Sequence, residues 1–177
     1  MAARCSSPGQ AGVRRGWLPG AAIPVAALAL AADAGAMTPS AACAAGEQRL
    51  FQCVSGERTM SLCADRARDV VRYRVAAPGQ SFEHVLSTDQ VRLGVTAYAG
   101  GGEARIRFND GATEYIAFDR SVRTGFDPDG DNDPEMSAGV VVNEAGGETT
   151  TLECDNNASI LAPAYEMLER DDSTDRP

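Results

Sequence analysis

Residues 49–63 have the sequence RLFQCVSGERTMSLC. Two runs of strand-forming residues, Arg49–Val54 and Thr59–Cys63, flank the short segment Ser55–Arg58, which contains a glycine. Alternation of apolar and polar residues is typical of strands with one buried face, and a short connection with glycine joins antiparallel neighbours. The stretch therefore predicts a β-hairpin.

The register of this hairpin determines where its cysteines point. A four-residue turn places Cys53 opposite Met60 and Cys63 opposite Leu50. Cys53 and Cys63 then lie on opposite faces of the sheet. Because their Cα atoms would be too far apart for a disulfide in a regular hairpin, each needs another partner.

Four cysteines follow the export signal described below, and an even number is typical of two disulfides in an exported chain. Three pairings of the four are formally open. Cys43 lies a few residues before the hairpin and can reach Cys63, which leaves Cys53 to bond Cys154. A zinc site is the competing interpretation, but the sequence has no Cys-x-x-Cys pair and only one histidine. We therefore expect the disulfides Cys43–Cys63 and Cys53–Cys154.

Further runs with the same alternation follow along the chain. Asn109-Asp110-Gly111 is a strong hairpin signal, and Glu144–Gly147 is a second turn between neighbouring runs. Antiparallel neighbours in series predict an all-β fold, a small antiparallel β-barrel or sandwich of about eight strands closed by two disulfides. The further runs are Val70–Val75, Phe82–Leu86, Val91–Tyr98, Ala104–Phe108, Thr113–Phe118, Met136–Val142 and Thr149–Cys154.

The first 36 residues have the organisation of an export signal. Three arginines precede the apolar segment Trp17–Ala32, which is too short for a comfortable transmembrane helix, and Ala34-Gly35-Ala36 matches a signal-peptidase site. We expect cleavage after Ala36 and a mature chain without a membrane span, in the periplasm or secreted. Arg14-Arg15 also fits a twin-arginine signal, so two export routes stay open. Dependence on disulfides favours export of the unfolded chain.

These boundaries divide the chain into four parts. A short helix is expected at Pro163–Arg170, because proline is favoured at the first helical position, and a disordered tail at Asp171–Pro177. The parts are the signal peptide, residues 1–36; an N-terminal extension, 37–48; the β domain, 49–155; and the C-terminal short helix and tail, 156–177.

The charge balance of the chain is acidic. All sixteen cationic residues are arginine, against 25 acids, which gives a net charge of −9. Removing residues 1–36 takes away three arginines and Asp33, leaving 13 cations, 24 anions and a net charge of −11. Nucleic-acid binders carry basic patches, so we expect no nucleic-acid partner and instead a basic protein.

One short segment, residues 127–135, concentrates five carboxylates without any cation. Asp127, Asp129, Asp131 and Glu135 have the one, three, five, nine spacing of short calcium loops, and oxygen ligands suit Ca²⁺. The segment departs from an EF-hand, since its glycine is at position four and alanine replaces the position-twelve glutamate. The sequence therefore suggests a Ca²⁺ site, with a solvated acidic loop as the alternative.

Residues for nucleophilic catalysis are scarce. His84 is the only histidine, no nucleophile motif accompanies it, and Gly-x-Ser-x-Gly does not occur. We expect His84 to be an ordinary strand residue at the surface or half buried. Arginines alternate with apolar residues in two predicted strands and are expected to form a solvated face that bridges to acids on neighbouring strands. They are Arg72, Arg74, Arg105 and Arg107.

Several short motifs resemble known exported proteins. Phe51-Gln52-Cys53, Gly56, the strand Thr59–Leu62 and a last strand ending in Cys154 resemble the small periplasmic or membrane-attached inhibitors of C-type lysozyme. The resemblance implies a small β-barrel whose first-strand and last-strand cysteines are bonded, and inhibition of a lysozyme. The family's C-terminal Trp and Lys motif has no counterpart, because this chain lacks lysine and its one tryptophan is in the signal. No inhibitory residue is therefore carried over.

A second resemblance concerns the middle of the chain. Arg105-Ile106-Arg107-Phe108, the Asn109-Asp110-Gly111 turn and Tyr115 resemble uncharacterised exported proteins of GC-rich proteobacteria, which implies a location only. From these observations we expect an exported, non-enzymatic binding module, an inhibitor of a basic cell-wall hydrolase such as lysozyme being one form. The alternative is a periplasmic enzyme or Ca²⁺-binding protein that uses the acidic segment 127–135.

Overall fold

The computed structural model of the chain describes residues 41–126 and 132–171. The export signal predicted in residues 1–36, with its cleavage after Ala36, lies outside the described residues. All described residues belong to one unit, which spans residues 37–177.

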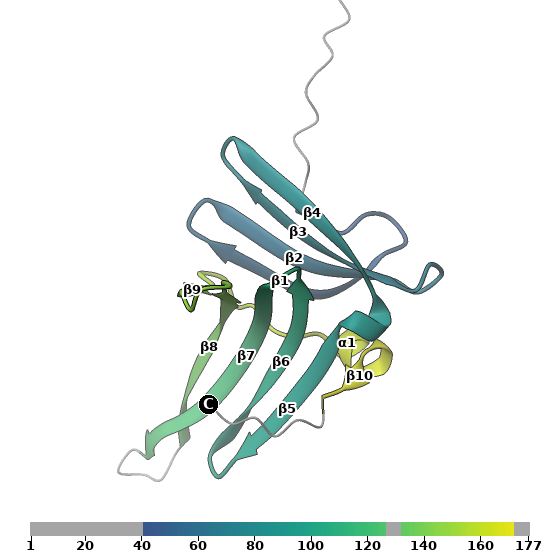
Figure 1. Cartoon of the computed structure of the whole chain (residues 1–177). Helices are drawn as coiled ribbons and strands as arrows, with labels where there is room; N and C mark the ends of the chain where they lie inside the picture. The colour runs from purple at the N-terminus through teal and green to yellow at the C-terminus, as the bar shows by residue number, and fades with distance from the viewer. Residues whose placement is uncertain (1–40, 127–131, 172–177) are drawn as a thin grey trace, which may run out of the picture. The chain divides into compact units, whose positions relative to one another are not determined.

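The first sheet is a meander of four antiparallel strands in the order β1-β2-β3-β4 (Figure 1). Short turns join β1 to β2 and β3 to β4. Gly56 and Gly79 in these turns have φ angles of 56° and 72°, a conformation that glycine adopts without steric cost. The strands are β1 Gln48–Ser55, β2 Arg58–Asp65, β3 Val70–Ala77 and β4 Gln80–Ser87.

A single 3-10 turn, η1 at Thr88–Gln90, leads from β4 into the second sheet. This sheet has six strands in the order β10-β5-β6-β7-β8-β9. Strands β5 to β9 are antiparallel neighbours, and β10 pairs with β5 in parallel. The elements are β5 Arg92–Tyr98, β6 Gly101–Asp110, β7 Thr113–Phe126, β8 Asn132–Asn143, β9 Thr149–Glu153, the helix α1 Ala162–Met167, and β10 Glu169–Arg170.

The hydrophobic core takes side chains from both sheets, so the two sheets pack face to face. Large apolar side chains that are fully buried contribute about 1.5–3 kcal/mol each. Phe51 of the first sheet and Phe108 of the second are the bulkiest of them. Other core members are Leu50, Met60, Leu62, Val71, Val75, Leu93, Ile106, Val140 and, from α1, Ala164.

The structure confirms the all-β prediction but corrects its form. Within residues 41–126 and 132–171, the strands form two separate sheets of four and six strands, ten in all, and these do not close into a barrel. The chain leaves the first sheet at η1, so β4 and β5 do not pair. The outer edge of β1 is bonded by residues 155–161, which are not a strand. A barrel would require a strand partner at both of these places.

Strand β1 contains a β-bulge at Leu50. Arg49 pairs with Cys63 and Phe51 with Leu62, so Leu50 has no direct partner in β2. Leu50 and Phe51 are consecutive, yet both are at most 1% exposed. The bulge allows both side chains to enter the core, which regular alternation forbids. The predicted pairing of Cys63 with Leu50 is therefore wrong by one residue.

Two disulfides join the pairs expected from the hairpin. Cys53 lies opposite Met60, in the predicted register. Cys43 is bonded to Cys63, with a Cα–Cα distance of 5.5 Å, and Cys53 is bonded to Cys154, with a Cα–Cα distance of 5.2 Å. The bulge does not change the pairing, because Cys63 still points away from the face that carries Cys53.

The hairpin of β7 and β8 is longer than the alternating runs predict. Backbone pairing continues to Phe126 opposite Asn132. Pro134 is part of β8, at a position where β9 no longer runs beside it, because the pairing of β8 with β9 begins at Gly139. Proline is tolerated at such an edge position. Residues 132–135, predicted as part of an acidic loop, are therefore strand.

The C-terminal part differs from its prediction in detail. The helix α1 ends at Met167, before the predicted Arg170, and the unpredicted strand β10 follows it. Asp171, predicted as the start of a disordered tail, donates its backbone N–H to the carbonyl of Leu93 at 2.9 Å. No helix within the described ranges is long and apolar enough to cross a membrane.

Candidate functional site

Of the four predicted calcium ligands, the structure describes one. Asp127, Asp129 and Asp131 are outside the described residues. Glu135 is an exposed residue of β8. Since Phe126 pairs with Asn132, the segment 127–131 connects two paired strands. The Ca²⁺ site stays a prediction.

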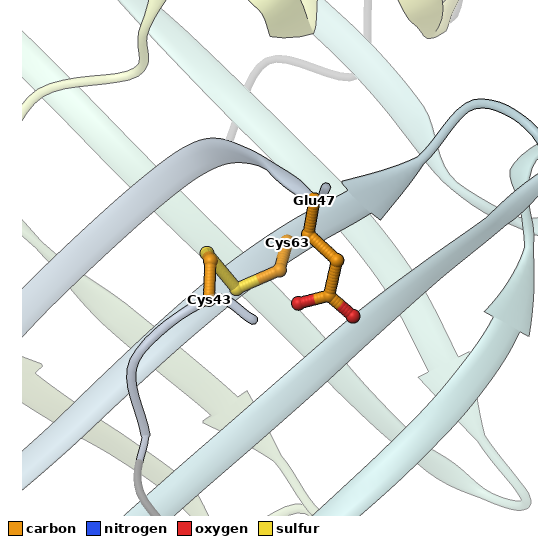
Figure 2. A group of neighbouring side chains, drawn as sticks. All are labelled: Cys43, Glu47 and Cys63. Atoms are coloured by element: carbon orange, nitrogen blue, oxygen red, sulfur yellow. A yellow bond between two sulfur atoms is a disulfide. The ribbon is translucent and has the colours of Figure 1, made fainter. Parts of the chain in front are cut away.

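A second group with ligand chemistry lies on the face of the first sheet that points away from the core (Figure 2). Cys43, Glu47 and Cys63 bring one ligand atom each within 4.8 Å of one another. The two sulfur atoms form a disulfide, so neither is a thiolate, which is the form that binds metals. Glu47 is in turn held by arginines. The group is a disulfide beside an ion pair.

Glu47 is the centre of that ion pair, and its side chain is only 6% exposed. Arg74 donates to its two carboxylate oxygens at 2.5 and 2.9 Å, Arg72 donates at 2.9 Å, and the backbone N–H of Ala44 donates at 2.7 Å. The bond from Arg74 is the main cause that lowers the pKa of Glu47, against the opposing effect of burial. The carboxylate is therefore held in its charged form.

Arg72 and Arg74 bridge to acids, as expected, but not on an open face. Arg74 also bonds Glu83, its cross-strand neighbour on β4, at 2.5 Å. The side chains of Arg72 and Arg74 are only 16% and 13% exposed. They are shielded by residues 41–47, which we call the N-terminal cover: Cys43 ties this segment to β2, and Ser61 donates a hydrogen bond to the Ala41 carbonyl.

His84 belongs to an aromatic cluster where the two sheets meet. Its ring stacks on Tyr73 with centroids 6.4 Å apart, and its Nδ1 lies 3.1 Å from a carboxylate oxygen of Asp110. All four described cysteines are disulfide-bonded, so none of them is a nucleophile for this histidine. We call the group the aromatic cluster: Tyr73, Phe82, His84, Phe108 and Tyr115.

A buried carboxylate also lies on the outer face of the second sheet. Glu103 is 8% exposed, accepts a hydrogen bond from the Tyr98 hydroxyl at 2.8 Å and forms an ion pair with Arg105. Burial raises the pKa of Glu103, but the bonds from Arg105 and Tyr98 outweigh it and leave the pKa lowered. With both oxygens bonded, this carboxylate is part of a structural ion pair.

Acids gather at the hairpin turns near the aromatic cluster. Burial is the main cause that raises the pKa of Tyr115, and Asp110 and Glu144, in the turns β6–β7 and β8–β9, add to it. Within the described part of the chain, none of the turn acids forms an ion pair with an arginine, although Arg58 lies at the same end. We call these exposed acids, which lie in or beside the hairpin turns, the acidic turn end: Glu57, Asp110, Glu144, Glu148 and Asp155.

Many of the described arginines are neutralised by ion pairs. Seven of them pair with acids, five on strands and two in the turn between β2 and β3, whereas the acids of the turn end have no arginine partner among the described residues. The paired arginines are Arg66, Arg68, Arg72, Arg74, Arg92, Arg105 and Arg107.

Two open depressions mark the described surface. One lies between the turns β1–β2 and β3–β4 and Leu152 of β9; the other lies between η1 and α1. Both are wide open, and enclosed, mostly apolar pockets are the usual sites for small molecules. The depressions are lined by Ser55, Glu57, Arg58, Ala77, Pro78 and Leu152, and by Arg66, Asp69, Thr88, Glu166 and Met167.

Sequence reasoning missed three features of this surface. Glu47 lies in a segment without strand pattern, and its contacts come from residues 25 and 27 positions away. Glu103 lies one residue before the predicted strand Ala104–Phe108, and its bonds come from the side chains of Tyr98 and Arg105. The aromatic cluster joins four strands, and only the apolar alternation of those strands hinted that their aromatic residues share a face.

Comparison with protein-family models, with curated proteins and with solved structures finds no match for this chain. The functional proposal therefore rests on the residues of this chain.

Proposed function

We propose that the chain is an exported, non-enzymatic binding module whose partner is a basic protein. Inhibition of a basic cell-wall hydrolase such as lysozyme is the most specific form of this proposal. The observation that carries it is the acidic turn end, where solvent-facing carboxylates stand without arginine partners among the described residues. Complementary charge speeds association and fixes orientation, so such a surface suits a basic partner.

The proposed location is the periplasm or the medium. The two disulfides are compatible with an oxidising compartment, and the signal expected in residues 1–36 supports export. Cell-wall hydrolases act in the same compartments, so the module and such a partner would meet there.

Purified oxidised protein beginning at Met37 tests the proposal against hen, invertebrate and phage-type lysozymes in low salt. We expect inhibition at micromolar concentration that weakens as salt is added, because exposed charges are screened. Absence of inhibition of all three would remove the inhibitor form, and absence of binding to them would remove lysozyme as the partner and leave the broader binding class open.

A matched pair of variants locates the charge effect. The double substitution Glu144→Gln and Glu148→Gln removes two charges from the acidic turn end. Glu166→Gln and Glu169→Gln remove two exposed charges, with side chains 66% and 71% exposed, elsewhere. We expect the first pair to slow association more than the second. Equal effects would show that only the net charge matters.

Calcium binding by residues 127–135 is the second candidate function, in a Ca²⁺-binding protein or a Ca²⁺-dependent enzyme. The observation that favours it is the pairing of Phe126 with Asn132, which brings together the residues that flank 127–131, the part of the segment with three of the four predicted ligands. A thermal shift on adding millimolar Ca²⁺, lost in Asp129→Ala, is expected if the site exists. An unchanged unfolding temperature of the unsubstituted protein would exclude it.

A further inference from the structure

The edge strands of the two sheets differ in how far other parts of the chain cover them. An edge strand presents unpaired backbone N–H and C=O groups, which bind another strand unless something covers them. Within residues 41–126 and 132–171, the edge strands are β1 and β4 in the first sheet and β9 and β10 in the second.

The outer edge of β1 is sealed by the segment 155–161. Asn156 accepts from the backbone N–H of Val54 at 2.8 Å and donates to the carbonyl of Gln52 at 3.3 Å. The carboxylate of Asp155 accepts a hydrogen bond from the backbone N–H of Gly56 at 2.6 Å. The backbone N–H groups of Asp155 and Leu161 each donate to a backbone carbonyl of β1. A backbone edge bonded in this way cannot take another strand.

The edges of the second sheet are covered in part. β10 and Asp171 cover β5 as far as Leu93, and the rest of β5 pairs with β6 alone. The part of β8 before Gly139 does not pair with β9, and it contains Pro134, which has no N–H to donate. The five-residue strand β9 is short and ends next to Cys154, which is bonded to Cys53. Short edge strands are one of the ways in which proteins avoid unwanted pairing.

Strand β4 has none of these protections. It pairs with β3 over all eight of its residues without a bulge, and no described strand pairs with its other edge (Figure 1). On that edge the N–H of Ser87, the last residue of the strand, donates to the side chain of Gln90 at 3.0 Å. It contains no lysine, arginine or proline. Phe82 on one face and Val85 on the other are 37% and 54% exposed. A long, regular and partly apolar edge is suited to strand addition.

We propose that β4 is a docking edge, to which an extended segment of a basic protein adds as a fifth strand of the first sheet. This inference rests on the proposed function and names the surface that the partner uses. Main-chain hydrogen bonds would supply affinity, and alternate side chains of the added strand would supply specificity.

Charge and ring chemistry beside β4 identify the occupant. On one face of the strand Glu83 is already paired with Arg74, whereas on the other Asp110 contacts His84, has no arginine partner among the described residues, and has a side chain 48% exposed. The exposed ring of Phe82, on the same face as His84, attracts a guanidinium or ammonium group. Cationic side chains of the added strand would therefore find an acid and an aromatic ring on that face.

The same chemistry disfavours a second copy of this chain on β4. Pairing two copies would bring their Glu83 residues to the same short interface. It would also join two domains that each carry a net charge of −11 when residues 1–36 are removed. Like charges across an interface oppose association.

A peptide of alternating arginine and valine, acetyl-RVRVRV-amide, is a direct probe of the edge. The matched control peptide carries N-methyl groups on alternate backbone amides, which removes the strand hydrogen bonds and keeps every charge. Hydrogen exchange of the oxidised protein from Met37 should slow at β4 with the first peptide only. Equal protection with both peptides, or protection elsewhere, would overturn the inference.

Two substitutions of equal charge test the position. Val85→Arg on β4 and Val95→Arg on β5 replace valines with exposures of 54% and 56%. We expect Val85→Arg to weaken binding of the probe peptide about tenfold relative to Val95→Arg. The introduced arginine on β4 would lie beside the arginines of the bound peptide and repel them. Equal affinities of the two variants would contradict a β4 site.

The outcomes separate the docking edge from the proposed function. If the peptide protects β4 but no lysozyme binds, the proposal of a docking edge is supported and lysozyme is excluded as the partner. If a lysozyme binds without protecting β4, and both valine variants bind it equally, the proposed function is supported and the docking edge is excluded. Absence of peptide binding at β4 overturns the edge in either case.

Discussion

Glu47 is a single residue on which the shielding of one sheet face depends. It ties the N-terminal cover to β3 through Arg72 and Arg74, while Cys43 ties the same segment to β2. Hydrogen bonds between ionised partners are about twice as strong as neutral ones, and removing one partner leaves the other buried without compensation.

Replacing Glu47 by glutamine should therefore destabilise the domain by about 2 kcal/mol at neutral pH. Because the folded state lowers the pKa of Glu47 below its ordinary value of 4.5, its contribution is complete above that value. The contribution is lost as pH falls through the lowered pKa. Urea unfolding at pH 7 and pH 3 should show a larger difference between parent and variant at pH 7 than at pH 3.

Glu148→Gln is the matched control, since Glu148 is an exposed turn residue. Its free energy of unfolding should stay within about 0.5 kcal/mol of the parent at both pH values. A difference for Glu47→Gln that does not shrink at pH 3 would show that the loss comes from packing and not from the charged form of the side chain.

Among the secondary-structure elements, β1 has the most unusual surroundings. One edge pairs with β2, and the other receives a cap from residues that follow β9. The side chain of Asn156 makes two of the bonds in this cap, which a strand partner would otherwise make. The cap thus ends the first sheet without adding a strand.

Asn156→Ala should cost about 1–2 kcal/mol, because it leaves the N–H of Val54 and the carbonyl of Gln52 without their described partner. Hydrogen exchange at the backbone N–H of Val54 should speed up by more than the decrease in the global free energy of unfolding explains. Asn157→Ala changes the exposed neighbouring asparagine and should alter neither quantity. Equal effects of the two substitutions would mean that the cap does not hold β1.

The existence of the long strands could be predicted from the sequence, whereas their ends and interruptions could not. Period-two alternation locates the nine longer strands of the described residues. The bulge at Leu50 escapes this signal, since two consecutive apolar residues also occur in regular strands. The two-residue strand β10 depends on contacts with β5 and has no pattern of its own.

The candidate site was less accessible to sequence reasoning. The acids of the turns are visible in the sequence. Their lack of arginine partners depends on the fold, which decides with which acids the arginines form ion pairs. The docking edge depends on strand order, because β4 is free only where the chain crosses to the second sheet at η1. Neither property follows from local composition.

For the whole molecule, the two disulfides contribute unequally to the stability of the folded state. Cys53–Cys154 closes 101 residues and Cys43–Cys63 closes 20. In the chain-entropy description they stabilise the folded state by about 4.7 and about 3 kcal/mol. These values are large beside a typical domain stability of about 5–15 kcal/mol.

Replacing Cys53 and Cys154 together by alanine should lower the free energy of unfolding by more than replacing Cys43 and Cys63, as measured by urea unfolding of both variants. A larger loss for the Cys43 and Cys63 variant would show that the stability gained from this disulfide comes mainly from holding the N-terminal cover in place and not from closing a loop.

The cap on β1 imposes an order of events on a chain made from its N-terminus. Val54 meets Asn156 across 102 positions, so the first strand waits for almost the whole domain before its edge is sealed. Cys43 and Cys63 are within reach of each other early, whereas Cys53 has to remain a thiol, or exchange a wrong partner, until Cys154 arrives. The last thiol to appear thus completes the oxidation of the first strand.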